Sequence, residues 1–294
     1  MSINKAVTLV GTENIPVRRM DFEFDDAIPT YWFADNPVMT MVMTGLSCTF
    51  PEGERMFIRS VRHYQDQITD PVLQKEVRAF IGQEANHGKE HDTFNAFMAK
   101  KGLPIYAIMD FVHKGIAREE QLFSAKRMLA KTCALEHFTA MFAERILESP
   151  ELLNSIDERL RALWLWHAIE ESEHKSVAFD VYQNQVGSYW VRVSEMALTT
   201  VIFSFFTGLH TFTLLRASGE LSNVKALRKG ADTLWGKKGF LKGMLPRYLA
   251  YYRRDFHPAQ LDSTALRADG LIRLDTILKH ISLYKTDVIS SIPS

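Results

Sequence analysis

Apolar residues recur at alternating steps of three and four along most of this chain, which is the spacing of amphipathic helices. Runs that alternate apolar and polar residues are scarce, so the pattern predicts an all-α fold. We expect long helices at about 53–68, 71–100, 118–148, 151–186 and 189–217, with shorter helices after residue 220. Long helices joined by short turns predict a four-helix bundle with additional C-terminal helices, in which a crossover carrying the segment 104–116 joins the second and third helices.

Capping residues mark several of these helix ends. Two expected starts carry a side chain that can cap a helix directly before a proline, at Asp70-Pro71 and Ser149-Pro150. Gly187 and Gly219 suit helix C-termini. The chain is then expected to divide into an N-terminal segment that packs on the bundle (1–50), the bundle itself (51–187), and a C-terminal helical extension with an apolar helix at 196–215 (188–294).

Two of the apolar stripes are interrupted in their middle by glutamate and histidine residues. In the second helix the stripe consists of Leu73, Val77, Phe80, Glu84, His87, His91, Phe94 and Met98. In the fourth it consists of Leu160, Trp164, His167, Glu171, His174, Ala178 and Val181. Each stripe places Glu-x-x-His where bundle packing calls for Leu or Ile. Because residues three apart share a helix face, each motif can present a carboxylate oxygen and an imidazole nitrogen to one point, as half of a metal site.

The first and third helices each supply one carboxylate in the same manner. Glu54 and Glu136 lie on apolar stripes, and each precedes its Glu-x-x-His motif by a similar number of residues, which returns the chain to the same height in the bundle. An isolated buried carboxylate costs several kcal/mol or more, so four at one level must be neutralised. Two divalent metal ions would do so. The expected ligands are therefore Glu54, Glu84, His87, Glu136, Glu171 and His174. Glu52 and Glu144 are the alternatives to Glu54 and Glu136 if the first or third helix is in another register.

The neighbouring histidines leave alternatives open. His167 and His91 lie on the same stripes, and each can be a direct ligand or a hydrogen-bonding neighbour of one. For Glu170, Glu173 and His137, which lie beside the stripes, we expect hydrogen bonding to ligands or exposure to solvent. Carboxylates with imidazoles suit iron, manganese or zinc. Iron is expected, because Glu plus Glu-x-x-His, twice over, is typical of di-iron and di-manganese carboxylate bundles.

At these residues the sequence resembles the ferritin-like di-iron superfamily. More narrowly, it resembles the bacterial family named predicted metal-dependent hydrolase over roughly residues 15 to 260. The resemblance rests on Leu46-Ser47, Phe50-Pro51-Glu52-Gly53-Glu54-Arg55, Gln83-Glu84-x-x-His87, Leu135-Glu136-His137, Trp166-His167-Ala168-x-Glu170-Glu171-x-Glu173-His174-Lys175 and Arg253-x-x-Phe256-His257-Pro258. The added His167 is also similar to the extra imidazole that binds one iron in di-iron arylamine N-oxygenases, which implies a seventh ligand.

Composition narrows the classes of function. Thirty-five basic and 35 acidic residues give a net charge of +0, which does not favour a nucleic acid partner. Cys48 and Cys133 form no thiolate metal motif. The N-terminus lacks an apolar core followed by a small-residue cleavage site, so we expect a cytoplasmic protein.

One segment points instead to a lipid surface. Met196–Leu215 contains no Asp, Glu, Lys or Arg, and 20 helical residues span about 30 Å, the thickness of a bilayer core. Its threonines lower its hydrophobicity, so a buried bundle helix is the alternative. The following segment, 216–254, has ten Lys or Arg against two acidic residues. We therefore expect that 190–254 can contact an anionic membrane, although a solvated basic helix face would look the same.

The leading hypothesis for function is a di-iron oxidoreductase that activates O2 and oxidises an apolar small molecule, with an electron donor that the sequence does not identify. The alternative is a hydrolase that uses a bridging water on the same two metals. A third hypothesis is iron binding or storage without catalysis.

Overall fold

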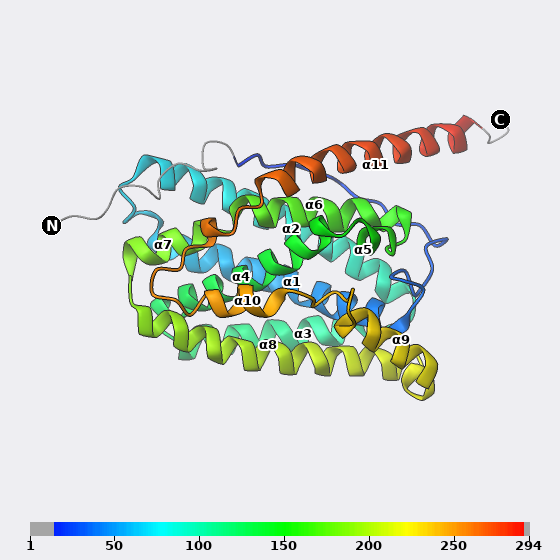
Figure 1. The fold of residues 1–294 in the computed structure, drawn as a ribbon, viewed down its shortest axis with the longest axis horizontal. Helices are drawn as coiled ribbons and strands as arrows, with labels where there is room; N and C mark the ends of the chain where they lie inside the picture. The colour runs from blue at the N-terminus through cyan, green and yellow to red at the C-terminus, as the bar shows by residue number, and fades with distance from the viewer. Residues whose placement is uncertain (1–14, 291–294) are drawn as a thin grey trace.

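The computed structural model of this protein describes residues 15–290, with side chains through residue 280 (Figure 1). The first 14 residues, on which the expectation about a leader segment depends, lie outside the described residues. Within the described range the chain is all-α, and the extended pairing is limited to one isolated bridge between Phe33 and Ile156. The all-α prediction is therefore confirmed.

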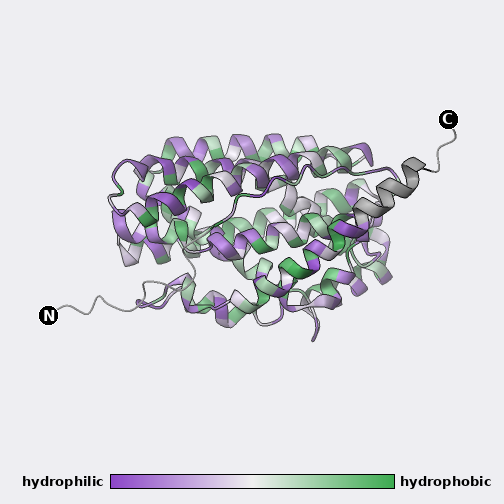
Figure 2. Ribbon diagram, turned by 90° about the horizontal axis from the view of Figure 1, so that it is seen from above, coloured by the Kyte–Doolittle hydropathy of each residue, from purple (hydrophilic) through white to green (hydrophobic). Residues whose placement is uncertain are grey.

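Four helices pack around a shared core. They are α1 (Pro37–Gln65), α2 (Pro71–Lys100), α4 (Ala125–Glu148) and α6 (Glu158–His174), and α7 (Val177–Gln185) continues the line of α6. The helix α1 packs along α2 and α4, and α6 packs along α4 and α2. Hydrophilic and hydrophobic residues are interleaved along the helices of the molecule, as amphipathic packing requires (Figure 2). The predicted bundle packing is consistent with these contacts.

The first helix begins earlier than its predicted start near residue 53, so that boundary is wrong. The side chain of Asn36 accepts hydrogen bonds from the backbone N–H groups of Val38 and Met39, and Pro37 occupies the first turn. Pro51 therefore lies inside α1, where it has no N–H to donate to the carbonyl oxygen of Ser47. The side-chain amide of Asn95 donates to that oxygen instead, at 2.9 Å, so a neighbouring helix compensates for the proline.

Two other predicted helices are interrupted. The helix expected at 151–186 is three helices, α5 (Pro150–Asn154), α6 and α7, because Asp157 caps a new start at α6 and the chain turns at residues 175–176. The helix expected at 118–148 is divided at residues 123–124, and its first part belongs to α3 (Ile105–Leu122), which is longer than the expected 104–116 segment. The predicted helices 71–100 and 189–217 match α2 and α8 (Tyr189–Ala217).

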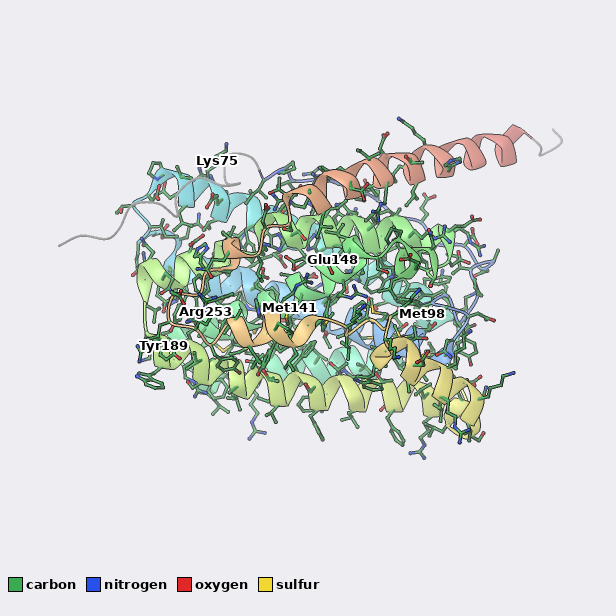
Figure 3. All side chains as sticks on the ribbon, viewed as in Figure 1. Lys75, Met98, Met141, Glu148, Tyr189 and Arg253 are labelled. Carbon is green, nitrogen blue, oxygen red and sulfur yellow. The ribbon has the colours of Figure 1, made fainter. Side chains whose placement is uncertain are left out.

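The C-terminal helices cover the bundle. The helix α8 lies along α1 and α4 and forms the lower edge of the molecule in Figure 1. It is followed by η1 (Glu220–Ser222), α9 (Val224–Trp235), α10 (Met244–Ala250), η2 (Pro258–Gln260) and α11 (Thr264–Ser290), and the last of these is longer than the expected short helices. Tyr189 at the start of α8 lies near Arg253 (Figure 3), and its hydroxyl donates to the carbonyl oxygen of Tyr252. Gly187 and Gly219 adopt positive φ after helices, as predicted.

Candidate metal centre

The structure places all seven expected ligand residues in the interior of the bundle. Each of these seven residues is at most 6% exposed. They come from four helices: Glu54 from α1, Glu84 and His87 from α2, Glu136 from α4, and His167, Glu171 and His174 from α6. The helical periodicity that placed carboxylates and imidazoles on apolar stripes therefore corresponds to real burial.

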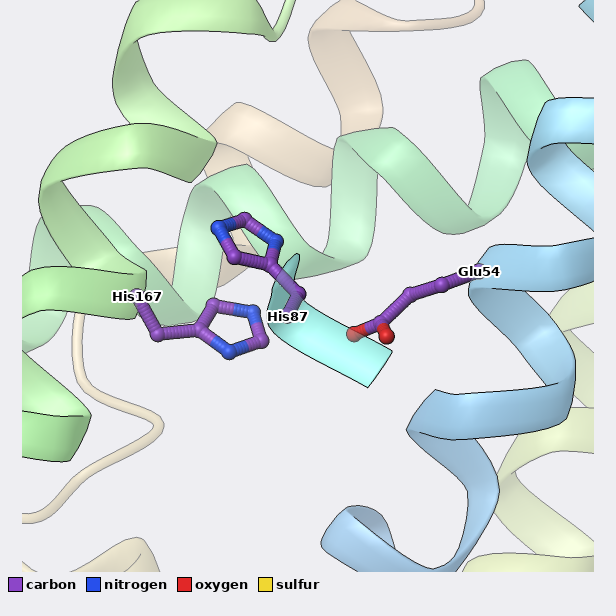
Figure 4. A group of neighbouring side chains, drawn as sticks. All are labelled: Glu54, His87 and His167. Atoms are coloured by element: carbon purple, nitrogen blue, oxygen red, sulfur yellow. The ribbon is translucent and has the colours of Figure 1, made fainter. Parts of the chain in front are cut away.

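These side chains form two triads that could each hold a metal ion. Glu54, His87 and His167 each offer one ligand atom, and these atoms lie within 4.8 Å of one another (Figure 4). Glu84, Glu171 and His174 form the second triad by the same measure. The geometry is consistent with a dinuclear metal site.

Glu171, a member of the second triad, also approaches the first. Its Oε1 atom is 3.0 Å from Nε2 of His167, 3.4 Å from Nδ1 of His87 and 3.7 Å from Nε2 of His174. Glu136 adjoins the second triad, with its Oε2 atom 3.5 Å from Nε2 of His174. Glu171 therefore reaches the imidazoles of both triads, and Glu136 would add a carboxylate to a metal held by the second triad.

Many of these atoms lack a hydrogen-bond partner among the residues that the structure describes. They are both carboxylate oxygens of Glu84 and Glu136, one oxygen of Glu54 and of Glu171, Nδ1 of His87 and Nε2 of His174. Leaving a buried polar group unsatisfied costs about 1–3 kcal/mol, and more when it is charged. The Nε2 atom of His174 is 2.9 Å from Oε1 of Glu84 without the geometry of a hydrogen bond. Atoms that converge without bonding to one another are what ligands around a shared cation show, so the residues fit a metal.

The pKa directions agree with this requirement for positive charge. Burial raises the pKa values of Glu54 and Glu136 well above the usual range, and it also raises that of Glu84. Burial alone would lower the pKa of His174, but the charges of Glu171 and Glu84 raise it well above normal. Protons thus take the place of cations in the metal-free site, and metal binding must release them.

The hydrogen bonds behind two imidazoles determine which ring nitrogen faces the centre. The side-chain amide nitrogen of Gln83 donates to the carbonyl oxygen of Pro16 and to Glu173, so Oε1 of Gln83 accepts from Nδ1 of His174, at 2.8 Å. Similarly, Nε2 of His87 donates to Glu170 at 3.1 Å. Nε2 of His174 and Nδ1 of His87 consequently face the carboxylates, and each would present a lone pair to a metal ion that displaces its proton, as in metal sites whose imidazoles are oriented by a second partner.

Arg18 joins these two supports. Its guanidinium contacts Glu170, the partner of His87, at 3.1 Å, and Glu173, which accepts from the partner of His174, at 2.8 Å. Of the two roles left open for Glu170 and Glu173, the structure supports hydrogen bonding. Sequence reasoning missed the roles of Arg18 and Gln83. Gln83 precedes Glu84 directly, but Arg18 lies 152 residues from Glu170 and carries no local signal.

A second chain of hydrogen bonds orients His167. Because Asn95 donates its amide to the carbonyl oxygen of Ser47, its Oδ1 must accept from the hydroxyl of Ser47, at 2.8 Å. That hydroxyl has one proton, so it accepts from Nδ1 of His91, also at 2.8 Å. The Nε2 atom of a neutral His91 then accepts from Nδ1 of His167, at 2.6 Å. His91 is therefore a support, and the lone pair of His167 Nε2 faces Glu171.

His167 is neutral near pH 7, because burial lowers its pKa to about 4. Its Nε2 atom and the Glu171 oxygen 3.0 Å away are then both acceptors, and a cation between them resolves the conflict. The alternative carboxylates are engaged elsewhere, since Glu52 pairs with Arg59, and Glu144 pairs with Lys175. His137 contacts the carbonyl oxygen of Arg247 rather than the ligands.

An apolar cavity adjoins the ligands. It has a volume of about 180 Å³, and Glu54 and Glu171 form part of its wall. Its other lining residues come from α1, α3, α4 and α8 and are mainly apolar, among them Phe50, Phe57, Ile116, Leu135, Ile202 and Phe203. Two charged lining residues, Glu119 and Lys131, pair with each other. The site therefore combines a polar, metal-binding end with space for an apolar molecule.

Fold and site together define an all-α protein with a buried cluster of carboxylates and histidines that could hold metal ions. A family model described as predicted metal-dependent hydrolase matches residues 16–262, and the chain belongs to this family. No curated protein and no solved structure matches the chain. The resemblance to this family, inferred from the motifs, is confirmed.

Proposed function

We propose that this chain is a metal-dependent hydrolase that holds two metal ions between its triads and acts on an apolar substrate in the adjoining cavity. The observation that supports it is the convergence of partnerless carboxylate and imidazole atoms at one end of an apolar cavity, in a chain of this family. In the sequence analysis, hydrolysis was the alternative to oxidation with O2. The description of the matching family favours hydrolysis over oxidation.

The residues of the site have three roles: they would hold the metal ions, orient the imidazole rings and bind the substrate. Two bound divalent ions would supply the Lewis acidity that activates water and polarises an ester or phosphoester. Glu171 contacts both triads and holds their spacing, while Gln83, Glu170 and His91 keep the imidazoles oriented. Glu54 lines the cavity and belongs to the first triad, so it would hold a metal ion at the end of the cavity. The apolar lining excludes bulk water and binds the substrate's hydrocarbon part.

Oxidation with O2 is a second candidate, and the ligand set favours it. Four glutamates and three histidines, with Glu-x-x-His on two helices, are the chemistry of ferritin-like di-iron proteins, which would make the metal iron. The packing of α1, α2, α4 and α6 supports that fold assignment. Metal storage, the third hypothesis, gives no role to an apolar cavity at the ligands.

A direct test uses the purified protein loaded with zinc. Under this proposal, the zinc form cleaves 4-nitrophenyl esters of medium-length apolar acids faster than the acetate, because the longer acyl chain fits the cavity. Glu84→Ala should abolish the reaction together with zinc binding, whereas His257→Ala, outside both triads, should leave it unchanged. Equal cleavage by the protein with and without zinc would show that the metal centre is not responsible.

A further inference from the structure

The helix α8 carries apolar residues on two opposite faces. Its inner face lines the cavity beside the metal ligands with Thr199, Ile202, Phe203, Phe206 and His210. Its outer face, defined here as Leu198, Val201, Phe205, Leu209 and Phe212, is exposed, with Val201 at 68% and Phe205 at 63%. In Figure 3 side chains of α8 project from the lower edge of the molecule with nothing packed against them. The helix α8 therefore separates the cavity from the surroundings of the protein on this side of the molecule.

Contacts of α8 with the bundle favour a helix that lies on a membrane over one that crosses it. Among the described residues it is the helix long and apolar enough to span a bilayer. However, the buried Arg192 donates to the carbonyl oxygens of Tyr251 and Arg253, and Glu195 pairs with Arg127 of α4. These bonds and the packing of α8 along α1 and α4 hold the inner face against protein, and a spanning orientation would have to break these contacts or bring the charged bundle into hydrocarbon.

Aromatic and basic residues flank the outer face. Trp190 is 70% exposed at one end of α8, where Arg254 lies 5.7 Å above its ring, and Trp235 is 69% exposed in the segment after α8. Exposed basic residues occupy the last turn of α8 and the segment after it, namely Arg216, Lys225, Arg228, Lys229, Lys237, Lys238 and Lys242. Because the whole chain has a net charge of +0, this positive charge is a local feature. Tryptophan and basic residues around an apolar stripe match the charge and polarity of an anionic lipid surface.

The cavity reaches the surface beside this face. Phe111 of α3 lines the cavity and is 48% exposed, and its ring lies 5.3 Å from that of Phe206 of α8. The opening is therefore between α3 and α8, next to the outer face. An apolar molecule held in lipid could move past Phe111 toward Glu54 and Glu171 without crossing water.

We propose that the outer face of α8 docks on an anionic lipid surface, and that the substrate is an amphiphile with one hydrocarbon chain that enters the cavity between α3 and α8. The choice of substrate class rests on the proposed function, whereas the docking does not. The helix would lie in the plane of the membrane, with its outer face about 5–10 Å deep at the boundary of headgroups and acyl chains.

Vesicle sedimentation with the full-length metal-loaded protein tests the docking. The protein should sediment with vesicles of phosphatidylglycerol and phosphatidylcholine at low salt, and less with phosphatidylcholine alone or at high salt. The double variant Val201→Glu with Phe205→Glu should lower the binding constant about tenfold or more, because two apolar side chains lose their burial in lipid. Val72→Glu, an exposed apolar residue of α2, is the matched control and should bind as the wild type does. Lys237→Glu with Lys238→Glu should weaken binding only to anionic vesicles, and Lys100→Glu should not.

Tryptophan fluorescence gives an independent measurement. The chain has five tryptophans, of which Trp32, Trp164 and Trp166 are buried. Vesicles with brominated acyl chains should quench Trp190 and Trp235, so Trp190→Phe with Trp235→Phe should remove the quenching. Wild-type protein that stays in the supernatant at low salt would overturn the proposal, as would equal losses in the α8 variant and the Val72 control. Dissociation of a dimer by the α8 variant with unchanged vesicle binding would show that a second copy covers this face, and would overturn it too.

Metal content separates this inference from the proposed function. A protein that binds vesicles but no metal refutes the hydrolase proposal and leaves the docking standing. A metal-loaded, hydrolytically active protein that ignores vesicles refutes the docking alone. For the substrate class, Phe203→Trp should reduce cleavage of long-chain esters at least about tenfold more than cleavage of the acetate, because the larger ring reduces the cavity volume that the longer acyl chain needs. Equal effects on both esters would overturn the assigned substrate class.

Discussion

The Nε2 atom of His167 lies 3.0 Å from Oε1 of Glu171, one turn further along α6, and the tautomer that His91 imposes on His167 leaves this nitrogen without a proton to donate. The Nδ1 proton of His167 is committed to His91, which Ser47 and Asn95 hold in turn. A contact between two acceptors inside the protein is unfavourable unless a cation lies between them. This relationship favours His167 as a metal ligand and leads to a first prediction.

Removing the support of His167 should weaken metal binding without removing a ligand. His91→Leu is expected to lower the affinity for zinc or iron(II) about 10–100-fold, because the imidazole of His167 loses its fixed tautomer. His91→Gln should lose less, since its side-chain oxygen can still accept from His167. Competition with a chelating dye measures the affinity. His257→Ala, whose ring contacts Asp180 away from the triads, serves as control, and equal affinity in His91→Leu and wild type would contradict the hydrogen-bond assignment.

Loss of a ligand should abolish metal binding and the stability that depends on it. Glu84→Ala and His174→Ala should each retain fewer metals per chain than the wild type. In the presence of metal at 100 to 1,000 times its dissociation constant, the wild type should gain about 3–4 kcal/mol of unfolding free energy that the variants lack. Metal analysis and thermal unfolding with and without chelator measure both effects. The assignment fails if both variants keep the full metal content.

Iron and zinc should separate the two candidate reactions, because oxygen activation needs electrons from the metal and hydrolysis needs only Lewis acidity. We expect the zinc form to hydrolyse esters. Reduced iron protein is then exposed to O2 while its optical absorption is recorded, with His167→Ala as the variant that should alter any signal from the site. If the iron form reacts with O2 and the zinc form cleaves nothing, the hydrolase proposal is wrong and oxidation takes its place.

Acid should destabilise the protein partly through His137. Burial lowers the pKa of this imidazole to about 4, from 6.5 for an exposed histidine, so between these values the unfolded chain binds a proton that the folded chain does not. Its share of the stability is therefore lost as the pH falls from 6.5 to about 4, and it amounts to at most about 3 kcal/mol. Urea unfolding at a series of pH values should give a shallower dependence for His137→Phe, whereas the exposed His63→Phe should follow the wild type.

Sequence periodicity by itself determined the helical class and the set of buried ligand candidates. Both depend on spacing within one helix: an apolar stripe must face a core, and a Glu-x-x-His motif on that stripe must be buried with it. The match of the predicted helix 71–100 to α2 shows that capping residues and apolar spacing can locate both ends of a helix. Helix interruptions, and the effect of prolines on helix boundaries, were harder to predict from the sequence. Pro51 looked like a boundary because nothing in its own neighbourhood reveals that Asn95 satisfies the carbonyl group it frees.

Only the tertiary structure decided how the ligand set is held and what lies next to it. Arg18, Gln83 and the series from His167 to Asn95 act through contacts between residues far apart in the chain, and helical spacing carries no information about such pairs. The cavity depends in the same way on how α3 and α8 pack over the bundle. Local sequence specifies which face of a helix is buried, but partners across a core are selected by packing of the whole chain, because each polar atom must find its partner among whichever side chains the fold brings to it.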